Sequence, residues 1–205
     1  MHRLMTEKEK MLSGKLYDSA DNELVRERMR AKDLCFSFNH TLPSDAAEQE
    51  KIIRLLFGKA GENFCICAPL WCDYGYNIEI GDNFFANHNT VILDPAKVVF
   101  GHNVFIAPNC GFYTAGHPID AERRNAGLEY AHPIIVGDNV WFGGGVHVLP
   151  GVSIGSNVVI GAGSIVTRDI PDNSVAVGNP CKVIRGIAGR DLELCQQGTE
   201  SFPPA

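Results

Sequence analysis

The residues best suited to acid–base chemistry lie in one polar segment near the middle of the chain. His117 is followed by Pro118, which favours an extended backbone at the histidine and a fixed presentation of its imidazole. Glu129 follows on the returning limb of the segment. A carboxylate at Nδ1–H would leave Nε2 free to take a proton from a hydroxyl, as in catalytic triads. We predict that His117 is a general base oriented by Glu129; an ordinary surface-loop histidine is the alternative interpretation.

A second group of residues could bind an anion and a flat ligand group. Arg168, Lys182 and Arg185 form a modest basic patch towards the end of the chain. This patch could bind a phosphate, and the alternative interpretation is an ordinary solvated surface. Trp141 stands one residue before an inward position of the repeat described next, so its side chain is expected to face outward. An exposed tryptophan there would suit packing against a flat ligand group.

These residues belong to a chain with a six-residue repeat. Counting in sixes from residue 136 gives apolar residues, and the position two earlier in each hexad is usually β-branched. The two series are Val136, Phe142, Val148, Ile154, Ile160, Val166 and Ile134, Val140, Val146, Val152, Val158, Ser164. This period does not fit a helix and predicts a mostly β fold, a parallel β-helix of short strands and tight turns. Small residues after the first series, such as Gly137 and Gly143, predict backbone freedom at those turns.

The chain divides into segments of different character. Residues 1–60 carry apolar residues at helical spacing and predict an N-terminal helical cap, with residues 6–9 capping its first helix. Residues 61–187 carry the repeat and predict the β-helix domain. The polar stretch 113–133 interrupts the repeat and predicts a protruding functional loop. Residues 188–205 have no periodicity and predict a loose C-terminal tail.

Evenly spaced histidines raise one alternative. His102, His117, His132 and His147 are 15 residues apart, and some proteins of β-helix architecture are zinc carbonic anhydrases. A step of 15 in a repeat of six alternates between inward and outward positions, so these side chains do not form one row. We therefore expect no metal, and a carbonic anhydrase-like protein is the less favoured interpretation.

Composition limits the class of partner. The chain has 205 residues and a formal net charge of -6 at pH 7, which disfavours nucleic acid as the main partner. No apolar run reaches the roughly 18–20 residues of a membrane span. The N-terminal residues lack the apolar stretch of a secretory signal. We expect a cytoplasmic protein that binds neither nucleic acid nor a membrane.

With these motifs, the chain resembles the maltose and galactoside O-acetyltransferase group of the hexapeptide-repeat acyltransferases over roughly residues 5–187. The N-terminal helical motif and the Gly-His-Pro loop are its most specific similarities. The matching segments are residues 6–11, 14–17, 38–40, 73–78, 83–87, 114–118, 139–141 and 161–167. The resemblance implies a left-handed β-helix, and a homotrimer with active sites between subunits.

The same resemblance implies roles for individual residues. His117 matches the catalytic base, and Glu129 matches the carboxylate that orients it. The positions that match sugar-binding residues are Asp18, Asp73, Asn87 and Asp94. The positions that match residues along acetyl-CoA are Trp141, Gly144, Ala162, Thr167, Arg168, Lys182 and Arg185. Asp73, and Pro95 where galactoside enzymes tend to have an acidic residue, favour a maltose-like or glucose-like acceptor over galactosides.

The expected reaction is direct transfer of the acetyl group within a ternary complex. His117 would remove the proton of a sugar hydroxyl as its oxygen attacks the thioester, and then protonate the CoA thiolate. The backbone N–H near Gly144 is the candidate donor to the oxyanion. An antibiotic or an amino acid is the alternative acceptor, although drug-modifying enzymes of this fold tend to lack the N-terminal helical motif.

Overall fold

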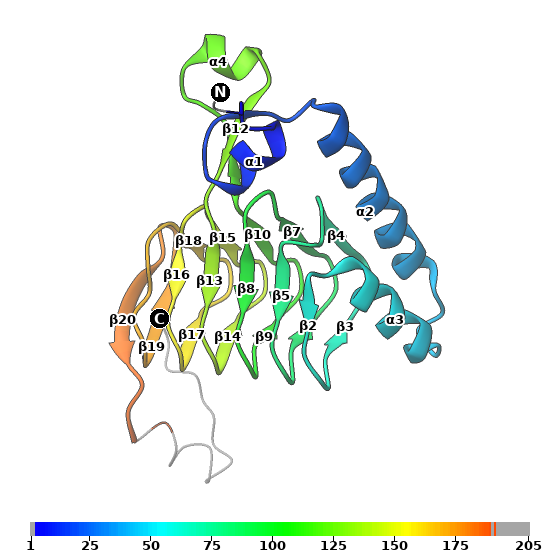
Figure 1. Cartoon of the computed structure of the whole chain (residues 1–205). Helices are drawn as coiled ribbons and strands as arrows, with labels where there is room; N and C mark the ends of the chain where they lie inside the picture. Colours follow the sequence, from blue (N-terminus) through cyan, green and yellow to red (C-terminus); the bar gives the residue numbers. More distant parts are fainter. Residues whose placement is uncertain (1–2, 190, 192–205) are drawn as a thin grey trace.

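Short strands recur at the spacing of the hexads and stack into three parallel sheets (Figure 1). The computed structural model describes residues 3–189 and 191. Sheet 1 comprises β2 (Lys59–Ala60), β5 (Ile78–Ile80), β8 (Val98–Phe100), β13 (Ile134–Val136) and β16 (Ser153–Ile154). Sheet 2 comprises β3 (Cys65–Ile66), β6 (Phe85–Ala86), β9 (Phe105–Ile106), β14 (Val140–Phe142), β17 (Val158–Ile160), β19 (Ser174–Val177) and β20 (Lys182–Gly186). Sheet 3 comprises β4 (Leu70–Cys72), β7 (Thr90–Leu93), β10 (Gly111–Tyr113), β15 (His147–Val148) and β18 (Ile165–Val166).

The three sheets form the sides of a triangular prism, which confirms the predicted β-helix. Each coil runs from sheet 1 through sheet 2 to sheet 3, and its strands pair in parallel with those of the next coil. At the C-terminal end, β20 turns back and pairs antiparallel with β19. The first strand of the prism, β2, begins at Lys59.

The interior of the prism is the column of residues that the hexads predicted. Every member of the two series is at most 2% exposed. Aromatic rings extend the column along the axis, with centroids 5.2 Å apart for Phe84 and Phe100, 4.9 Å for Phe100 and Phe112, and 5.2 Å for Phe112 and Phe142. Tilted and edge-to-face pairs of this kind each contribute about 0.5–1.5 kcal/mol beyond burial. The polar member Ser164 is satisfied because its hydroxyl donates to the carbonyl of Gly161 at 2.6 Å.

The corner between sheets 1 and 2, here the asparagine corner, corrects one prediction. The backbone enters the left-handed region at asparagines and not at the glycines: φ is +55° at Asn103 and +57° at Asn139. The glycines are required by close approach instead, since a Cβ on Gly137 would lie 2.8 Å from the carbonyl carbon of Gly155 in the next coil. The asparagine side chains bond from coil to coil, with Asn103 Nδ2 donating to Asn139 Oδ1 at 3.1 Å.

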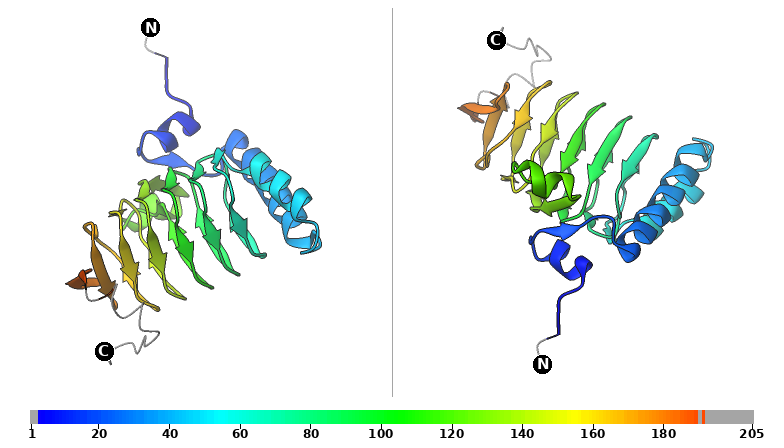
Figure 2. Two further views of the ribbon diagram at one scale, coloured as in Figure 1. Left: turned by 90° about the horizontal axis from the view of Figure 1, so that it is seen from below. Right: turned by 90° about the horizontal axis from the view of Figure 1, so that it is seen from above.

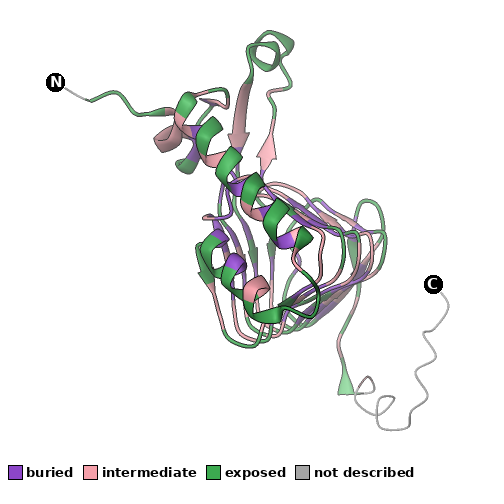
Figure 3. Ribbon diagram, turned by 90° about the vertical axis from the view of Figure 1, so that its right-hand side faces the viewer, coloured by how far each residue is buried: buried purple, intermediate pink, exposed green. Residues whose placement is uncertain are grey.

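Helices cover the N-terminal end of the prism. Helix α2 (Asn22–His40) and helix α3 (Ala46–Leu56) lie across the end that faces the viewer in Figure 3. Their buried side chains, including Phe38 and Ile53, join the same apolar cluster as Leu70 of the first coil. Helix α1 (Glu7–Leu12) has the expected capping box between Thr6 and Glu9. Among the described residues, no helix is long and apolar enough to cross a membrane.

A hairpin protrudes from the prism where the repeat is interrupted. It contains β11 (Ala115–Gly116), α4 (Ala121–Asn125) and β12 (Leu128–Ala131). The N-terminal strand β1 (Tyr17–Asp18) pairs antiparallel with β12, so hairpin and N-terminal segment form one small sheet, β1-β12-β11. Both views in Figure 2 show α1 and β1 beside this hairpin. The expected functional loop is therefore stabilised by its pairing with β1.

Candidate functional site

His117 follows β11 directly and has an exposed side chain. Its Nδ1 lies 3.3 Å from the carbonyl oxygen of Leu128 on the facing strand β12. A carbonyl oxygen can only accept a hydrogen bond, so in the neutral ring the proton belongs on Nδ1. The lone pair is then on Nε2, as a general base requires.

Glu129 does not hold His117 in the predicted way. Its Oε2 accepts a hydrogen bond of 2.6 Å from the hydroxyl of Tyr17, whereas Nδ1 of His117 is directed to the Leu128 carbonyl. The register of the small sheet explains the difference, because it places Tyr17 opposite Glu129 and Asp18 opposite Leu128. The orienting group is a main-chain carbonyl, so the predicted His117–Glu129 contact is wrong for this structure.

The corner between sheets 3 and 1, from which the hairpin leaves, carries two further site candidates. We call it the Asp73 corner. Asp73 follows β4 and is partly exposed, and burial raises the pKa of its carboxyl. The charges of Arg28 and Lys32 oppose this rise, and the charge of Glu129 adds to it. Asp18 is also partly exposed, and its backbone N–H donates to Glu7 Oε2 at 2.7 Å. Glu129 links the two candidates, because its charge acts on Asp73 and its strand β12 pairs with Asp18 and faces His117. We call these four residues the acidic neighbourhood.

Asp94, expected to contact a sugar, has a different position. It is 0% exposed, and its Oδ1 accepts from the backbone N–H groups of Tyr74 at 2.8 Å and Asp73 at 3.1 Å. Its Oδ2 accepts from the N–H of Asn77 at 3.3 Å. Burial raises the pKa of Asp94 to about 7, and these N–H groups oppose the rise. Asp94 therefore shapes the turn that presents Asp73, and the expected direct ligand contact does not fit its burial.

The remaining sugar-binding candidate lies on another edge of the prism. Asn87 stands between β6 and β7, at the corner between sheets 2 and 3, which we call the Asn87 corner. It is partly exposed, and its Oδ1 accepts from the N–H of His88 at 2.8 Å. Gly144 and Ala162 occupy the same corner in later coils, where the N–H of Gly163 donates to the carbonyl of Gly144 at 2.8 Å.

The other candidates for the coenzyme lie on sheet 2 and after β18 of sheet 3. Trp141 of β14 faces outward as predicted and is 43% exposed. Thr167 and Arg168 are exposed and follow β18 at the Asp73 corner, and Lys182 is exposed on β20. Arg185 is engaged: its two Nη atoms each lie 2.9 Å from a carboxylate oxygen of Asp191. The basic patch is therefore partly neutralised within the chain.

The other histidines of the evenly spaced set have separate surroundings. His147 Nδ1 lies 3.0 Å from the hydroxyl of Tyr113, and His102 Nδ1 lies 3.2 Å from Asp82 Oδ2. His132 packs against the ring of Tyr130. Within residues 3–189 and 191, no group of three His, Cys, Asp or Glu side chains could hold a metal ion. The spacing of 15 is not reflected in a shared site.

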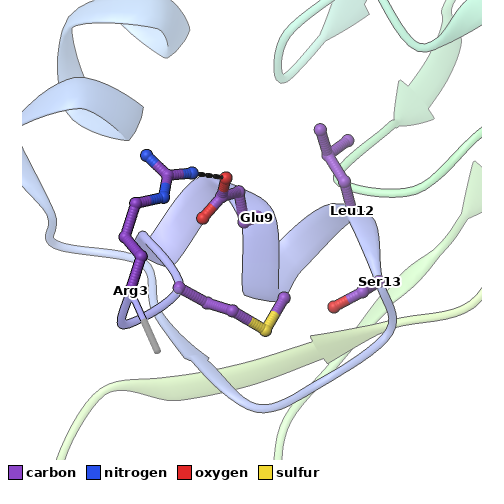
Figure 4. Close-up of a pocket in the computed structure, with 5 residues that line it drawn as sticks. Arg3, Glu9, Leu12 and Ser13 are labelled. Atoms are coloured by element: carbon purple, nitrogen blue, oxygen red, sulfur yellow. Dashed lines mark hydrogen bonds and ion pairs between the residues drawn. The ribbon is translucent and has the colours of Figure 1, made fainter. Parts of the chain in front are cut away.

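A hollow beside α1 lies apart from these residues (Figure 4). Its volume is about 490 Å³, and its lining is Arg3, Met5, Glu9, Leu12 and Ser13. Arg3 and Glu9 pair with each other across it. The hollow contains none of the predicted site residues, and its one carboxylate is paired with Arg3, so we do not place the reaction there.

Sequence reasoning missed the groups that fix His117 and Glu129. Tyr17 belongs to a motif that carried the resemblance, but no role was assigned to it. The Leu128 carbonyl is a backbone group, and no side-chain pattern could reveal it. The one available signal was the polar hairpin itself. An exposed strand edge there needed a pairing partner, and β1 supplies it.

A prism of hexapeptide coils, with a helical N-terminal cap and a hairpin that presents a histidine, defines a hexapeptide-repeat acetyltransferase. Residues 10–61 match the maltose acetyltransferase hexapeptide capping motif, and residues 133–168 match the bacterial transferase hexapeptide family of six repeats. The chain therefore belongs to the maltose and galactoside O-acetyltransferase group of these enzymes.

Individual relatives agree over nearly the whole chain. The galactoside O-acetyltransferase of Escherichia coli K12 is 48% identical over 89% of this chain and 90% of its own length. A maltose O-acetyltransferase of Clostridium difficile 630 is 55% identical, with a TM-score of 0.89 over 91% of this chain and all of that one. A Vibrio cholerae hexapeptide-repeat acetyltransferase, solved with acetyl coenzyme A, is 39% identical, with a TM-score of 0.83 over 90% and 100% of the two chains.

Proposed function

We propose that this protein transfers the acetyl group of acetyl-CoA to a hydroxyl of a sugar, with His117 as general base. The observation that carries the proposal is the contact between His117 Nδ1 and the Leu128 carbonyl, 3.3 Å apart, which leaves Nε2 to accept a proton. The relatives support it, since two of them are named as sugar O-acetyltransferases and a third was solved with acetyl-CoA.

The proposed reaction needs no acyl-enzyme and no metal. Nε2 of His117 takes the proton of the sugar hydroxyl as its oxygen attacks the thioester carbonyl carbon. The tetrahedral intermediate collapses with cleavage of the C–S bond, and His117 returns the proton to the CoA thiolate. General-base assistance of this kind is worth about 10²–10⁴-fold. The backbone N–H of Gly144 is the proposed donor to the oxyanion.

The acceptor is proposed to bind at the acidic neighbourhood around His117. Asp18, Asp73 and Asn87 would accept or donate hydrogen bonds to sugar hydroxyls, and Asp94 would support Asp73 from beneath through the turn. We place Glu129 with the acceptor and not behind His117, because its carboxylate acts on Asp73 and is held by Tyr17. Several carboxylates suit a polyhydroxyl ligand, and a maltose-like or glucose-like sugar is favoured over galactosides.

Acetyl-CoA is proposed to lie along the Asn87 corner. Gly144 and Ala162 are partly or fully exposed there, and small residues allow the pantetheine chain to approach the backbone. Trp141 offers an exposed ring beside them. The charged and polar residues proposed for the phosphates and the adenosine end are Thr167, Arg168, Lys182 and Arg185.

The two groups of site residues suggest a homotrimer. In one chain, the Asp73 corner carries His117 and the Asn87 corner carries Gly144, and sheet 3 separates the two. A complete site would form where the Asp73 corner of one subunit meets the Asn87 corner of the next. Light scattering of the purified protein should therefore give a mass close to three chains.

The test is acetyl transfer followed by mass spectrometry. Purified protein would be incubated with acetyl-CoA and, separately, maltose, glucose, a galactoside, chloramphenicol and an amino acid. We expect a sugar to gain one acetyl group and His117→Ala to lose at least about a hundredfold in rate. Modification of a non-sugar alone would overturn the acceptor class, and full activity of His117→Ala would overturn the mechanism. Stoichiometric zinc with no acetyl transfer would favour the carbonic anhydrase alternative.

A further inference from the structure

The side chain of Tyr17 connects the N-terminal segment to the site. It is 1% exposed and packs in a small apolar core with Met11, Leu24 and Tyr74, separate from the core of the prism. Its hydroxyl donates to Glu129 Oε2 at 2.6 Å, across 112 residues of sequence. A buried phenol that donates a hydrogen bond to a partly exposed carboxylate can fix the orientation of that carboxylate.

The backbone around Tyr17 makes this placement rigid. β1 pairs with β12 in a register that sets Tyr17 opposite Glu129 and Asp18 opposite Leu128. The N–H of Asp18 is in turn held by Glu7 of α1 at 2.7 Å. The N-terminal segment therefore fixes the strand that supplies both Glu129 and the carbonyl facing His117.

The proton of this hydrogen bond stays on Tyr17. Burial raises the pKa of the phenol far above its usual value, and the neighbouring charge of Glu129 raises it further. The phenol is thus a donor throughout the range in which Glu129 is ionised. Only one oxygen of Glu129 is used by this bond, and the carboxylate lies near enough to Asp73 to raise the pKa of that carboxyl.

We propose that Tyr17 is a positioning residue of the acceptor site: its hydroxyl fixes Oε2 of Glu129, so that Oε1 is presented to the acceptor beside Asp73. The inference rests on the proposed function, since it requires that the acceptor binds at this corner. It assigns to the N-terminal segment a direct share in acceptor affinity, beyond its pairing with the hairpin.

The chain contains a matched control for this bond. Tyr76 packs against the same small core, and its hydroxyl donates to Glu27 Oε2 of α2 at 2.7 Å. Burial and the Glu27 carboxylate raise the pKa of Tyr76 in the same way. Tyr76→Phe therefore removes a second tyrosine–glutamate bond, whose acceptor lies on α2 instead of the hairpin and also pairs with Lys8.

The experiment compares Tyr17→Phe, Tyr76→Phe, Glu129→Ala and the Tyr17→Phe/Glu129→Ala double variant with the wild type. KM is measured separately for the sugar that the wild type acetylates and for acetyl-CoA, and Tm is recorded for each variant. We expect Tyr17→Phe to raise the sugar KM about three- to tenfold, the worth of one hydrogen bond, with the acetyl-CoA KM unchanged. In the Glu129→Ala background, Tyr17→Phe should add no further change.

Each outcome decides the matter. A sugar KM that rises in Tyr17→Phe but not in Tyr76→Phe, at similar Tm, supports the positioning role. Equal behaviour of the two phenylalanine variants, or a full Tyr17→Phe effect in the Glu129→Ala background, overturns it while leaving the proposed function intact. A wild-type protein that acetylates no sugar overturns the proposed function and the inference with it.

Discussion

The Nδ1 atom of His117, which follows β11, and the carbonyl oxygen of Leu128, which begins β12, lie 3.3 Å apart in the hairpin. The tautomer of the proposed base is thus set by the main chain of β12 and not by a carboxylate. Because β12 is paired on its other edge with β1, the geometry of the base depends on the N-terminal segment.

This relationship predicts different outcomes for His117 and Glu129. Glu129→Gln keeps the Leu128 carbonyl in place, so kcat at saturating acceptor should stay within about tenfold of wild type. His117→Ala removes the base and should lose at least about a hundredfold. Steady-state kinetics with both substrates varied would measure this. Equal losses of kcat in the two variants would restore Glu129 as the orienting group.

Asp94 predicts a pH dependence of stability. Burial raises its pKa to about 7 in the folded chain, above the value of about 4 expected when unfolded. The folded state therefore holds a proton that the unfolded state has released between these values, and stability falls as the pH rises from about 4 to about 7. Thermal unfolding of the wild type and of Asp94→Asn across this window should show the difference in Tm shrinking as the pH rises.

The informative quantity for Asp94 is how the difference in Tm between the two proteins changes with pH, and not the size of that difference at one pH. Asp94→Asn is expected to be less stable overall, since an amide nitrogen would face the N–H of Asn77 in place of Oδ2. A constant difference in Tm from pH 4.5 to pH 8 would show that the Asp94 carboxyl titrates as an ordinary exposed group.

The fold could be predicted from the sequence because the hexad period is fixed by coil geometry. Each hexad forms one side of a coil and points one apolar side chain into the core. Val136 of sheet 1 and Phe142 of sheet 2 are two such residues, and each is at most 2% exposed. A further signal was available but unused: an asparagine stands three residues after two members of the first apolar series. Asn139 follows Val136 and Asn157 follows Ile154, and both have positive φ.

The site was less predictable because its key contacts join distant segments. The Tyr17–Glu129 bond has no periodic signal. The resemblance led us to expect a sugar contact at Asp94, because matching a position in the sequence does not show whether the side chain there is buried. Its environment depends on a turn that curls three N–H groups towards one carboxylate, and this is visible only in three dimensions.

The asparagine corner predicts a specific stability effect. Asn103 has φ of +55° and two ladder bonds, accepting from Asn83 at 2.9 Å and donating to Asn139 at 3.1 Å. Asn103→Ala loses both bonds and strains the backbone, and should cost about 1–3 kcal/mol. Asn103→Gly should recover part of this, because glycine accepts positive φ. Urea unfolding at one fixed protein concentration measures both, and a glycine variant less stable than the alanine variant would contradict the explanation.

The pair between Arg185 and Asp191 predicts opposite effects on coenzyme affinity. Asp191 occupies both Nη atoms at 2.9 Å, so a phosphate must share or replace that carboxylate. Asp191→Asn should lower the Kd for CoA about three- to tenfold, and Arg185→Ala should raise it about tenfold. Isothermal titration calorimetry would measure both, with Glu50→Gln, which breaks the Arg54–Glu50 pair on α3, as the control expected to have no effect. Weaker CoA binding by Asp191→Asn would mean that Asp191 orients Arg185 for the phosphate and does not compete with it.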